Sequence, residues 1–427
     1  EKTVMPKPVI LTFVDYYLPG YKAGGPIRTI ANMVERLSES LSFRVVTRDR
    51  DHGDTEPYPN CQTGTWIPVG KSDVMYLAPH ETSFGRLRTV LNQTRYKVLY
   101  LNSLFSRLSI RLLLLRRLRL IRPCPIVLAP RGELAASALA RRPMRKRAYL
   151  RLAKILSLFR GITWQASSRY EQTDIRKRIA RSASVAIAED LSPRIGMGEE
   201  TQPHRPKRPG VLDVLFLSRI HRVKNLDYAI RILGDLKGQI TLNVYGPVED
   251  RAYWDECREL IERMPANVTV CYRGAVANEQ VRPIMRDHDL FLLPTRGENF
   301  GHVILEALLA GCPVLTSDQT PWRGLQEKGV GWDLPLTDSE RFRSVLQEIV
   351  NMDEFQHHRL SQRVAAFARQ TCLDETRLKR NRMLFLKTKE DFEERRETDF
   401  RSDDQSRAAA LVTAIVLETL KGVSDGI

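Results

Sequence analysis

Short apolar segments of strand length recur along this chain and alternate with stretches of helical periodicity. Strands joined by helices predict parallel, doubly wound sheets. A chain of 427 residues is long enough for two such domains. The expected strands fall in two series, residues 9–14, 43–47, 98–101 and 126–129, then 211–217, 240–245, 268–272, 290–293 and 314–316.

The two series are separated by residues 199–210, which contain three prolines, many charges and no apolar residue. Such a composition predicts a linker or surface loop. We therefore expect an N-terminal Rossmann-like domain over residues 1–198 and a C-terminal one over 211–387. The tail, residues 388–427, is densely charged and then carries a short Ala/Leu/Val-rich helix at 407–420, to which the sequence assigns no role.

The net charge of +16 is concentrated, because residues 107–160 hold fifteen Lys or Arg and a single acidic residue. This excess predicts attraction to an anionic surface. No signal peptide, membrane-spanning stretch or Cys-x-x-Cys pair is recognisable, so we expect a cytoplasmic protein with reduced thiols. Motifs for nucleic-acid or dinucleotide binding and clusters of metal-ligand spacing are lacking, so no nucleic acid, cofactor or metal is expected.

Two glutamates, Glu298 and Glu306, are separated by seven residues around a turn that contains Gly301. An apolar helical run follows this turn. A glycine lets the backbone approach a ligand closely, and the N-terminus of the helix favours an anion. The segment therefore predicts a binding site, and the alternative is a charged loop before an ordinary surface helix.

Two cations, Arg219 and Lys224, come directly after the first strand of the second domain. Ligands of open α/β sheets bind at the carboxyl ends of strands, where these cations can neutralise a pyrophosphate. The alternative is a solvated basic turn. In the first domain, Gly24 and Gly25 occupy a strand–glycine–helix turn of the kind that faces phosphate.

The run from Arg296 to Ala307 resembles the Glu-x7-Glu signature of retaining, nucleotide-sugar-dependent glycosyltransferases of group 1, or family 4. The flanking strand at 291–295 and the helix and strand at 306–315 resemble that family as well. A weaker resemblance extends over about residues 9–385. It implies the α/β GT-B fold, with two Rossmann-like domains facing a central cleft. The first domain would bind the acceptor and the second the donor nucleotide.

The resemblance also implies roles for individual residues. Arg219 and Lys224 would hold the donor diphosphate and stabilise the leaving nucleotide. Glu298 would position the sugar, while Glu306 would accept hydrogen bonds from the ribose hydroxyls. The remaining donor-binding positions are the backbone amides of Asn299, Phe300 and Gly301, the base-contacting segment that contains Val276, and the loop at Gly24 and Gly25.

The first domain departs from the family in one respect. Many relatives carry a histidine after the strand at 98–101, where this chain has Asn102 and Ser103. One of these two residues would have to position the sugar instead. Arg131, after the next strand, could bind an acceptor phosphate or form an ion pair with Glu133.

The expected function is hexosyl transfer, with retention, from a nucleotide-diphosphate sugar to a sugar or lipid-linked acceptor. UDP is the expected nucleotide, and bacterial-type polysaccharide or glycolipid assembly is the expected setting. One alternative is another enzyme of this architecture, such as a sugar-nucleotide epimerase or a phosphorylase. The other is a non-catalytic, basic membrane- or nucleic-acid-binding protein.

Residues 144–159 predict an amphipathic helix. Its apolar face is expected to pack on the first-domain sheet, and its cations to meet the inner face of an anionic membrane. The alternative is that these cations are merely solvated. The expected apolar face is Met144, Ala148, Leu152, Ile155, Leu156 and Phe159, and the expected basic face is Arg147, Arg151 and Lys154.

Overall fold

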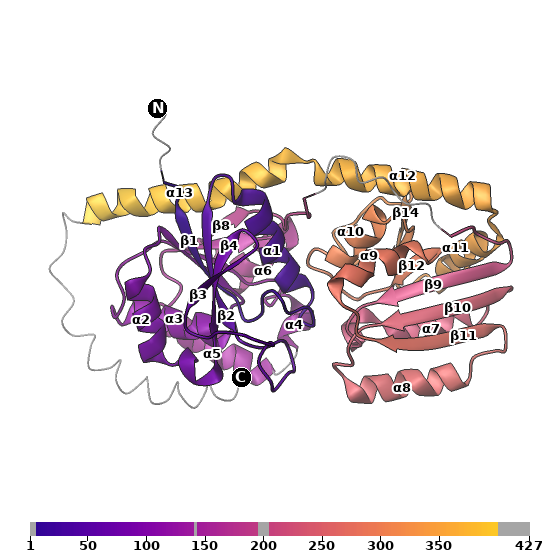
Figure 1. The fold of residues 1–427 in the computed structure, drawn as a ribbon, viewed down its shortest axis with the longest axis horizontal. Coiled ribbons are helices and arrows are strands. Elements are labelled where there is room, and N and C mark those ends of the chain that lie inside the picture. Colours follow the sequence, from indigo (N-terminus) through magenta and orange to yellow (C-terminus); the bar gives the residue numbers. More distant parts are fainter. Residues whose placement is uncertain (1–5, 141–142, 195–204, 400–427) are drawn as a thin grey trace. The chain divides into compact units, whose positions relative to one another are not determined.

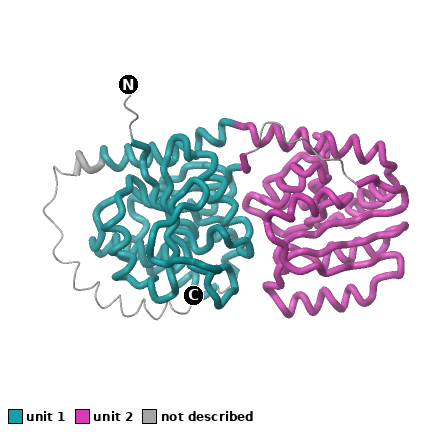
Figure 2. Tube along the Cα trace, in the orientation of Figure 1, with its two compact units in different colours: residues 1–191, 375–427 teal, residues 192–374 magenta. Residues whose placement is uncertain are grey.

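The computed structural model describes residues 6–140, 143–194 and 205–399. Within them the chain forms two compact units (Figure 2). Unit 1 comprises the chain up to Leu191 together with the segment from Glu375 onward, and unit 2 comprises residues 192–374. Each unit is an α/β assembly around its own sheet (Figure 1).

The sheet of unit 1 has eight strands in the order β3-β4-β2-β1-β5-β6-β7-β8. Neighbours are parallel except for the antiparallel pair β3 and β4. The order reverses between β1 and β5, which places a switch point at their carboxyl ends. The strands are β1 (Val9–Phe13), β2 (Ser42–Arg48), β3 (Trp66–Val69), β4 (Ser72–Leu77), β5 (Val98–Asn102), β6 (Ile126–Ala129), β7 (Ile162–Ala166) and β8 (Ser184–Ile187).

The sheet of unit 2 has six parallel strands in the order β11-β10-β9-β12-β13-β14. Here the order reverses between β9 and β12, where the candidate site lies. The strands are β9 (Val211–Leu217), β10 (Gln239–Tyr245), β11 (Val268–Gly274), β12 (Leu290–Leu293), β13 (Val314–Ser317) and β14 (Gly331–Leu334).

Helices cover the sheets of both units. Those of unit 1 are α1 (Gly25–Leu37), α2 (Phe84–Gln93), α3 (Arg107–Arg117), α4 (Ala136–Leu139), α5 (Pro143–Ile155), α6 (Arg169–Arg178) and α13 (Glu375–Asp399), with the 3-10 turn η1 (Pro79–Thr82). Those of unit 2 are the 3-10 turn η2 (Arg222–Lys224) and α7 (Leu226–Leu233), α8 (Arg251–Glu262), α9 (Asn278–Arg286), α10 (His302–Leu309), α11 (Ser339–Asn351) and α12 (Glu354–Cys372).

The strands predicted from apolar runs are all present, and their central members are buried on both faces. In β5 and β12 every residue is buried. A parallel sheet covered by helices on both faces requires such continuous apolar strands, which is why these runs were recognisable. Five further strands, β3, β4, β7, β8 and β14, were not predicted.

The observed units differ from the predicted domain boundaries at two places. Lys207, in the predicted linker, is buried and donates hydrogen bonds to the carbonyls of Arg208 (2.8 Å) and Val350 (3.4 Å), so this segment packs on unit 2. Residues 375–387 were predicted to belong to the second domain, but α13 begins at Glu375 and belongs to unit 1. The helix predicted at 407–420 lies outside the described residues.

Helix α13 is built into unit 1 by its apolar side chains. Phe385 is fully buried, and its ring lies 5.1 Å from that of Tyr100 on β5 and 6.1 Å from that of Phe43 on β2. Asn381 donates to the carbonyl of Glu189 at 2.7 Å. In the part of the chain that the structure describes, no helix is long and apolar enough to cross a membrane.

Candidate functional site

The loops that follow β9 and β12 are joined by main-chain contacts at the carboxyl edge of the unit 2 sheet. The carbonyl of Val223 accepts from the amide of Arg296 (2.7 Å) and from the hydroxyl of Thr295 (3.0 Å). Asn225 takes a left-handed conformation (φ 63°) and donates to the carbonyl of Pro294 at 2.9 Å. These bonds fix the turn that carries Lys224 against the loop that carries Glu298.

Lys224 and Glu298 consequently form an ion pair across the two loops. Their side chains are only 15% and 12% exposed, so the pair is shielded from solvent on most sides. A cation held in this way keeps a defined position and is less screened than a surface charge. The two residues that the sequence predicted to bind phosphate and sugar are therefore in direct contact.

Arg219 lies at the exit of β9 and pairs with Glu249 at 2.7 Å. The position of the β9 exit depends on Gly246, which follows β10. A Cβ built on Gly246 would lie 1.9 Å from the carbonyl oxygen of Ser218. The backbones of Gly246 and Ser218 can approach so closely only because Gly246 lacks a side chain. This approach fixes the position of the backbone of Arg219, the residue after Ser218.

The predicted sugar-contacting loop turns into α10 at Gly301, which has φ 77° and caps the helix. Phe300, before it, is buried against Trp322 with ring centroids 5.8 Å apart. The indole nitrogen of Trp322 donates to the carbonyl of Phe300 at 2.7 Å, and the amide of Glu298 donates to the carbonyl of Gln319 at 3.1 Å. The loop is thus fixed from the β13–β14 connection, while Glu306 lies in α10 with a partly exposed side chain.

The segment predicted to contact the base begins at the end of β11. Tyr272 is 41% exposed, lies 4.7 Å from the ring of Trp254, and donates to the carbonyl of Gly246 at 2.9 Å. Val276 is partly buried and packs against the core of unit 2. Sequence reasoning missed Trp254, Glu249 and Gln319, because none of them lies in a recognisable motif.

The glycine turn of unit 1 has the predicted form. Gly24 adopts φ 67° and ψ −121°, and α1 begins at Gly25 with Pro26 in its first turn. No acidic residue of α1 itself lies in this first turn. A Cβ at Gly24 would meet no atom within 4 Å, so the turn is open on that side.

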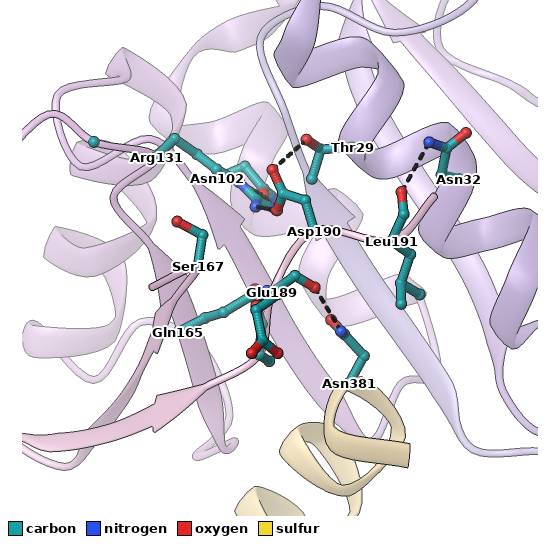
Figure 3. A network of polar contacts seen from close by, with 12 residues as sticks. Thr29, Asn32, Asn102, Arg131, Gln165, Ser167, Glu189, Asp190, Leu191 and Asn381 are labelled. Atoms are coloured by element: carbon teal, nitrogen blue, oxygen red, sulfur yellow. Dashed lines mark hydrogen bonds and ion pairs between the residues drawn. The ribbon is translucent and has the colours of Figure 1, made fainter. Parts of the chain in front are cut away.

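Arg131 forms an ion pair with Asp190, and not with Glu133, the partner that the sequence had suggested as one possibility. Its guanidinium binds Asp190 at 2.6 Å, the hydroxyl of Tyr100 at 2.5 Å and the side-chain oxygen of Asn102 at 2.8 Å. Figure 3 shows Arg131, Asn102 and Asp190 in this network. Arg131 is 10% exposed and Asp190 is 4% exposed. Arg131 therefore holds the ends of β5 and β6 to the segment after β8.

The residues that replace the family's histidine are both engaged in local contacts. Asn102 is buried and binds Arg131 and the carbonyl of Phe13 (3.4 Å). Ser103 donates to Glu133 at 2.7 Å, and Glu133 also accepts from the amides of Leu104 (2.6 Å) and Phe105 (3.2 Å). Burial raises the pKa of Glu133 to about 7, although these three hydrogen bonds favour its charged form.

Helix α5 and the residues after it confirm only part of the predicted apolar face, since Leu152, Leu156 and Phe159 are partly buried against the core of unit 1. The buried residues of α5 are Tyr149, Leu150 and Ala153. Met144 and Ile155, which were expected to pack inward, are 83% and 79% exposed. They share the outer face with the predicted cations, so this face is the stripe Met144, Arg147, Ala148, Arg151, Lys154 and Ile155.

The chain is similar to known proteins in sequence and in structure. Residues 199–366 match the family described as glycosyl transferases group 1. A stretch of 174 residues is 29% identical to the putative colanic acid biosynthesis glycosyltransferase WcaL of Salmonella typhimurium, and covers 38% of this chain and 42% of that protein. The chain thus spans less than half the length of the curated relatives it matches.

Solved structures share the fold at low identity. Sucrose-phosphate synthase from Thermosynechococcus elongatus superposes with a TM-score of 0.63 at 15% identity, over 92% of this chain and 100% of that one. Anabaena HepE, solved with UDP and glucose, gives 0.60 at 16% identity over the same shares. The match to the glycosyl transferase family covers residues 199–366, and the two parallel sheets together with the likeness to these solved structures show the GT-B fold.

Proposed function

We propose that this protein transfers a hexosyl group from a nucleotide-diphosphate sugar to an acceptor hydroxyl with retention of configuration. The observation that carries the proposal is the shielded Lys224–Glu298 ion pair at the carboxyl edge of the unit 2 sheet. It joins the two motifs that the sequence predicted independently. It also lies in the part of the chain that matches the glycosyltransferase family.

In this proposal the residues of unit 2 act by position and charge. Lys224 and Arg219 bind the diphosphate and stabilise the negative charge that develops on it as the glycosidic bond breaks. Both cations have carboxylate partners, Glu298 and Glu249. The diphosphate therefore displaces or shares these partners when it binds, and Glu298 becomes available to the sugar hydroxyls.

The donor and acceptor are proposed from chemistry and from named relatives. UDP is the preferred nucleotide, because HepE, which shares the fold, was solved with UDP and glucose. A polysaccharide or lipid-linked acceptor is proposed because WcaL, which is similar over 174 residues, is named for colanic acid biosynthesis. The proposal uses no metal or cofactor, since two cations already serve the diphosphate.

Product analysis tests the proposal against the other enzyme classes. The protein is incubated with UDP-glucose, UDP-galactose or GDP-mannose and a panel of acceptor sugars, and products are identified by mass spectrometry and NMR. A transferase releases nucleotide diphosphate and forms an α-linked product from an α-linked donor. A changed sugar on an intact nucleotide would show an epimerase, and release of sugar phosphate with inorganic phosphate present would show a phosphorylase.

The Glu306→Ala variant tests the proposed donor site itself. If Glu306 accepts ribose hydrogen bonds, its removal costs about 1.5–3 kcal/mol, which is roughly tenfold to a hundredfold in donor affinity. Calorimetry with UDP measures this change, and Glu340→Ala, an exposed glutamate on α11, is the control. Equal UDP affinity in wild type and Glu306→Ala would contradict the assignment.

A second proposal concerns the outer face of α5, which we infer to contact an anionic membrane. Three cations, Arg147, Arg151 and Lys154, lie on this face between the exposed side chains of Met144 and Ile155. Cations near an anionic surface contribute about 1 kcal/mol each, and apolar side chains at the ends of the stripe can enter the headgroup region. A lipid-linked acceptor would be presented at such a surface.

Vesicle sedimentation tests this face. The wild type is expected to sediment with phosphatidylglycerol-containing vesicles at low salt and to be released at high salt. The triple variant Arg147→Glu, Arg151→Glu, Lys154→Glu should remain in the supernatant. Lys146 is kept, because it points inward to the carbonyl of Ala138 (2.8 Å). A wild type that ignores anionic vesicles at low salt would show that the cations are only solvated.

A further inference from the structure

The glycine turn of unit 1 is preceded by residues 18–23, and these residues lie over a buried carboxylate. Asp51, in the loop after β2, is 4% exposed. One of its oxygens accepts from the amides of Tyr21 (2.7 Å) and Lys22 (2.9 Å), and the other from the amide of His52 (2.7 Å). Amides bound to a buried carboxylate are charge-assisted donors, which are stronger than neutral ones.

Close packing shows how tightly the chain is held at this point. A Cβ added to Gly20 would lie 2.3 Å from the hydroxyl of Tyr58 and 3.0 Å from the carboxyl carbon of Asp51. The hydroxyl of Tyr76 on β4 donates to the carbonyl of Leu18 at 2.5 Å. The main chain before Gly24 is therefore fixed by hydrogen bonds to the side chains of Asp51, after β2, and Tyr76, on β4.

The segment after Gly24 is fixed by residues that follow β8, the strand at the far edge of the sheet (Figure 3). Thr29 on α1 donates to Asp190 at 2.9 Å, and Asn32 donates to the carbonyl of Leu191 at 2.9 Å. Asp190 is itself held by Arg131. Two buried carboxylates, Asp51 and Asp190, thus bracket the turn, whereas the space beside Gly24 is open.

We propose that Asp51 is a positioning residue that holds residues 18–25, called here the glycine loop, in the shape that receives the donor phosphate. The inference rests on the proposed function, which assigns a nucleotide sugar to this protein. A turn with a positive φ is one of several conformations open to a glycine, and fixing it in advance lowers the entropy lost on binding. Asp51 acts through the backbone of the loop and does not touch the substrate.

The Asp51→Asn variant separates this role from simple packing. Asparagine has the same size, but an NH2 group replaces one oxygen and opposes an amide N–H that needs an acceptor. The neutral amide oxygen is a weaker acceptor than a carboxylate oxygen even if it still faces Tyr21 and Lys22, and the NH2 group then opposes the amide of His52. We therefore expect hydrogen exchange of the Tyr21 and Lys22 amides to rise by about tenfold. The donor KM should rise by about tenfold, with kcat within about threefold, because positioning of the loop affects donor binding first.

Asp54→Asn is the matched control. Asp54 is 38% exposed and forms an ion pair with the side chain of Lys22 at 2.5 Å, on the surface of the same loop. Its replacement should leave amide exchange in the glycine loop and the donor KM unchanged. If Asp51→Asn does not fold, Tyr76→Phe provides the second variant, because it removes the bond to Leu18 and should shift exchange and KM in the same direction.

The outcomes distinguish this inference from the proposed function. Kinetics use whichever of UDP-glucose, UDP-galactose and GDP-mannose the wild type turns over best. Faster exchange with an unchanged KM would overturn the positioning role, and so would unchanged exchange in Asp51→Asn. A wild type that turns over none of the three donors, with any acceptor tested, would overturn the proposed function, and the donor role of the glycine loop with it.

Discussion

At the scale of single residues, the ion pair with Glu298 holds the Lys224 ammonium group in a defined position in unit 2. Neither side chain is fully buried, so the pair does not carry the full cost of removing two ions from water. In the proposed function, the donor diphosphate replaces the glutamate as the partner of Lys224. The same contact lets a lysine hold a fixed position at the end of a loop, although its side chain is flexible.

Replacing Lys224 should therefore affect turnover more than stability. In Lys224→Ala we expect kcat at saturating donor to fall by roughly a hundredfold or more, because a charge on the leaving phosphate loses its stabilising partner. The control is Arg222→Ala, which removes a neighbouring, 50% exposed cation that pairs with Glu256. Steady-state kinetics measure kcat for both variants. An equal kcat in Lys224→Ala and Arg222→Ala would show that Lys224 has no role in the mechanism.

Glu133 gives a prediction about pH. Its pKa is about 7 in the folded protein against an ordinary value of 4.5. Because its pKa is higher in the folded than in the unfolded protein, the folded state binds the proton of Glu133 more tightly. The resulting contribution to the free energy of unfolding is fully present below pH 4.5 and is lost as the pH rises through 7. A shift of this size corresponds to roughly 3 kcal/mol. The Glu133→Gln variant cannot ionise, so its stability relative to wild type should increase between pH 5 and pH 8.

Denaturant unfolding at several pH values measures that difference. Glu56→Gln, which removes an exposed glutamate of the same unit, should show no such trend. A difference between Glu133→Gln and wild type that is constant from pH 5 to pH 8 would show that Glu133 titrates normally in the folded state.

The site residues were predictable where a motif supplied them, and their partners were not. Glu298 and Lys224 belong to patterns that can be read along the chain. Asp190 is 59 positions from Arg131, and Asp51 is 29 positions from Lys22, so only the fold brings them together. The roles assigned to the site residues stay predictions.

At the scale of elements, the strands were easy to predict and the orientation of α5 was not. A buried parallel strand is a short continuous apolar run, bounded by turn residues and too brief for a typical helix. Helix α5 has apolar residues on several sides, including Met144, Tyr149 and Ile155. Its periodicity therefore allows more than one buried face, and packing of Tyr149 against Phe105 and Phe159 selects the observed one.

The pairing of β9 with β10 leads to a prediction about Gly246. Alanine at this position would place a methyl group 1.9 Å from the carbonyl oxygen of Ser218, at a residue with φ 136°. Overpacking of this kind costs typically about 1–3 kcal/mol, to which the backbone strain adds. Gly246→Ala should lower both stability and turnover, because the exit of β9 carries Arg219.

Gly274→Ala is the matched control for steric crowding. Gly274 also has a positive φ (77°), but its Cβ would meet no atom within 4 Å. Thermal unfolding should therefore show a smaller loss in Gly274→Ala than in Gly246→Ala. Equal losses would mean that backbone conformation, rather than the contact with Ser218, limits residue 246.

At the scale of the whole molecule, the division of the chain was predicted only in part. The first boundary was placed within several residues of the observed one, since composition changes there. The return of the chain to unit 1 at Glu375 was not predicted. Helix α13 has a largely charged sequence, and its few buried side chains mark no partner. Three-dimensional contacts, such as those of Leu384 and Phe385 with the core of unit 1, assign this helix to unit 1.

This assignment predicts which unit loses stability when α13 is weakened. Phe385 is fully buried beside Phe43 and Tyr100, and replacing a buried phenylalanine with alanine costs about 3–5 kcal/mol. In Phe385→Ala, amide exchange should accelerate in the strands of unit 1 and stay unchanged in unit 2. The control is Phe355→Ala on α12, whose side chain is 68% exposed and should matter little. Exchange that accelerates in unit 2 instead would place this part of α13 in the second domain, where the sequence alone had put it.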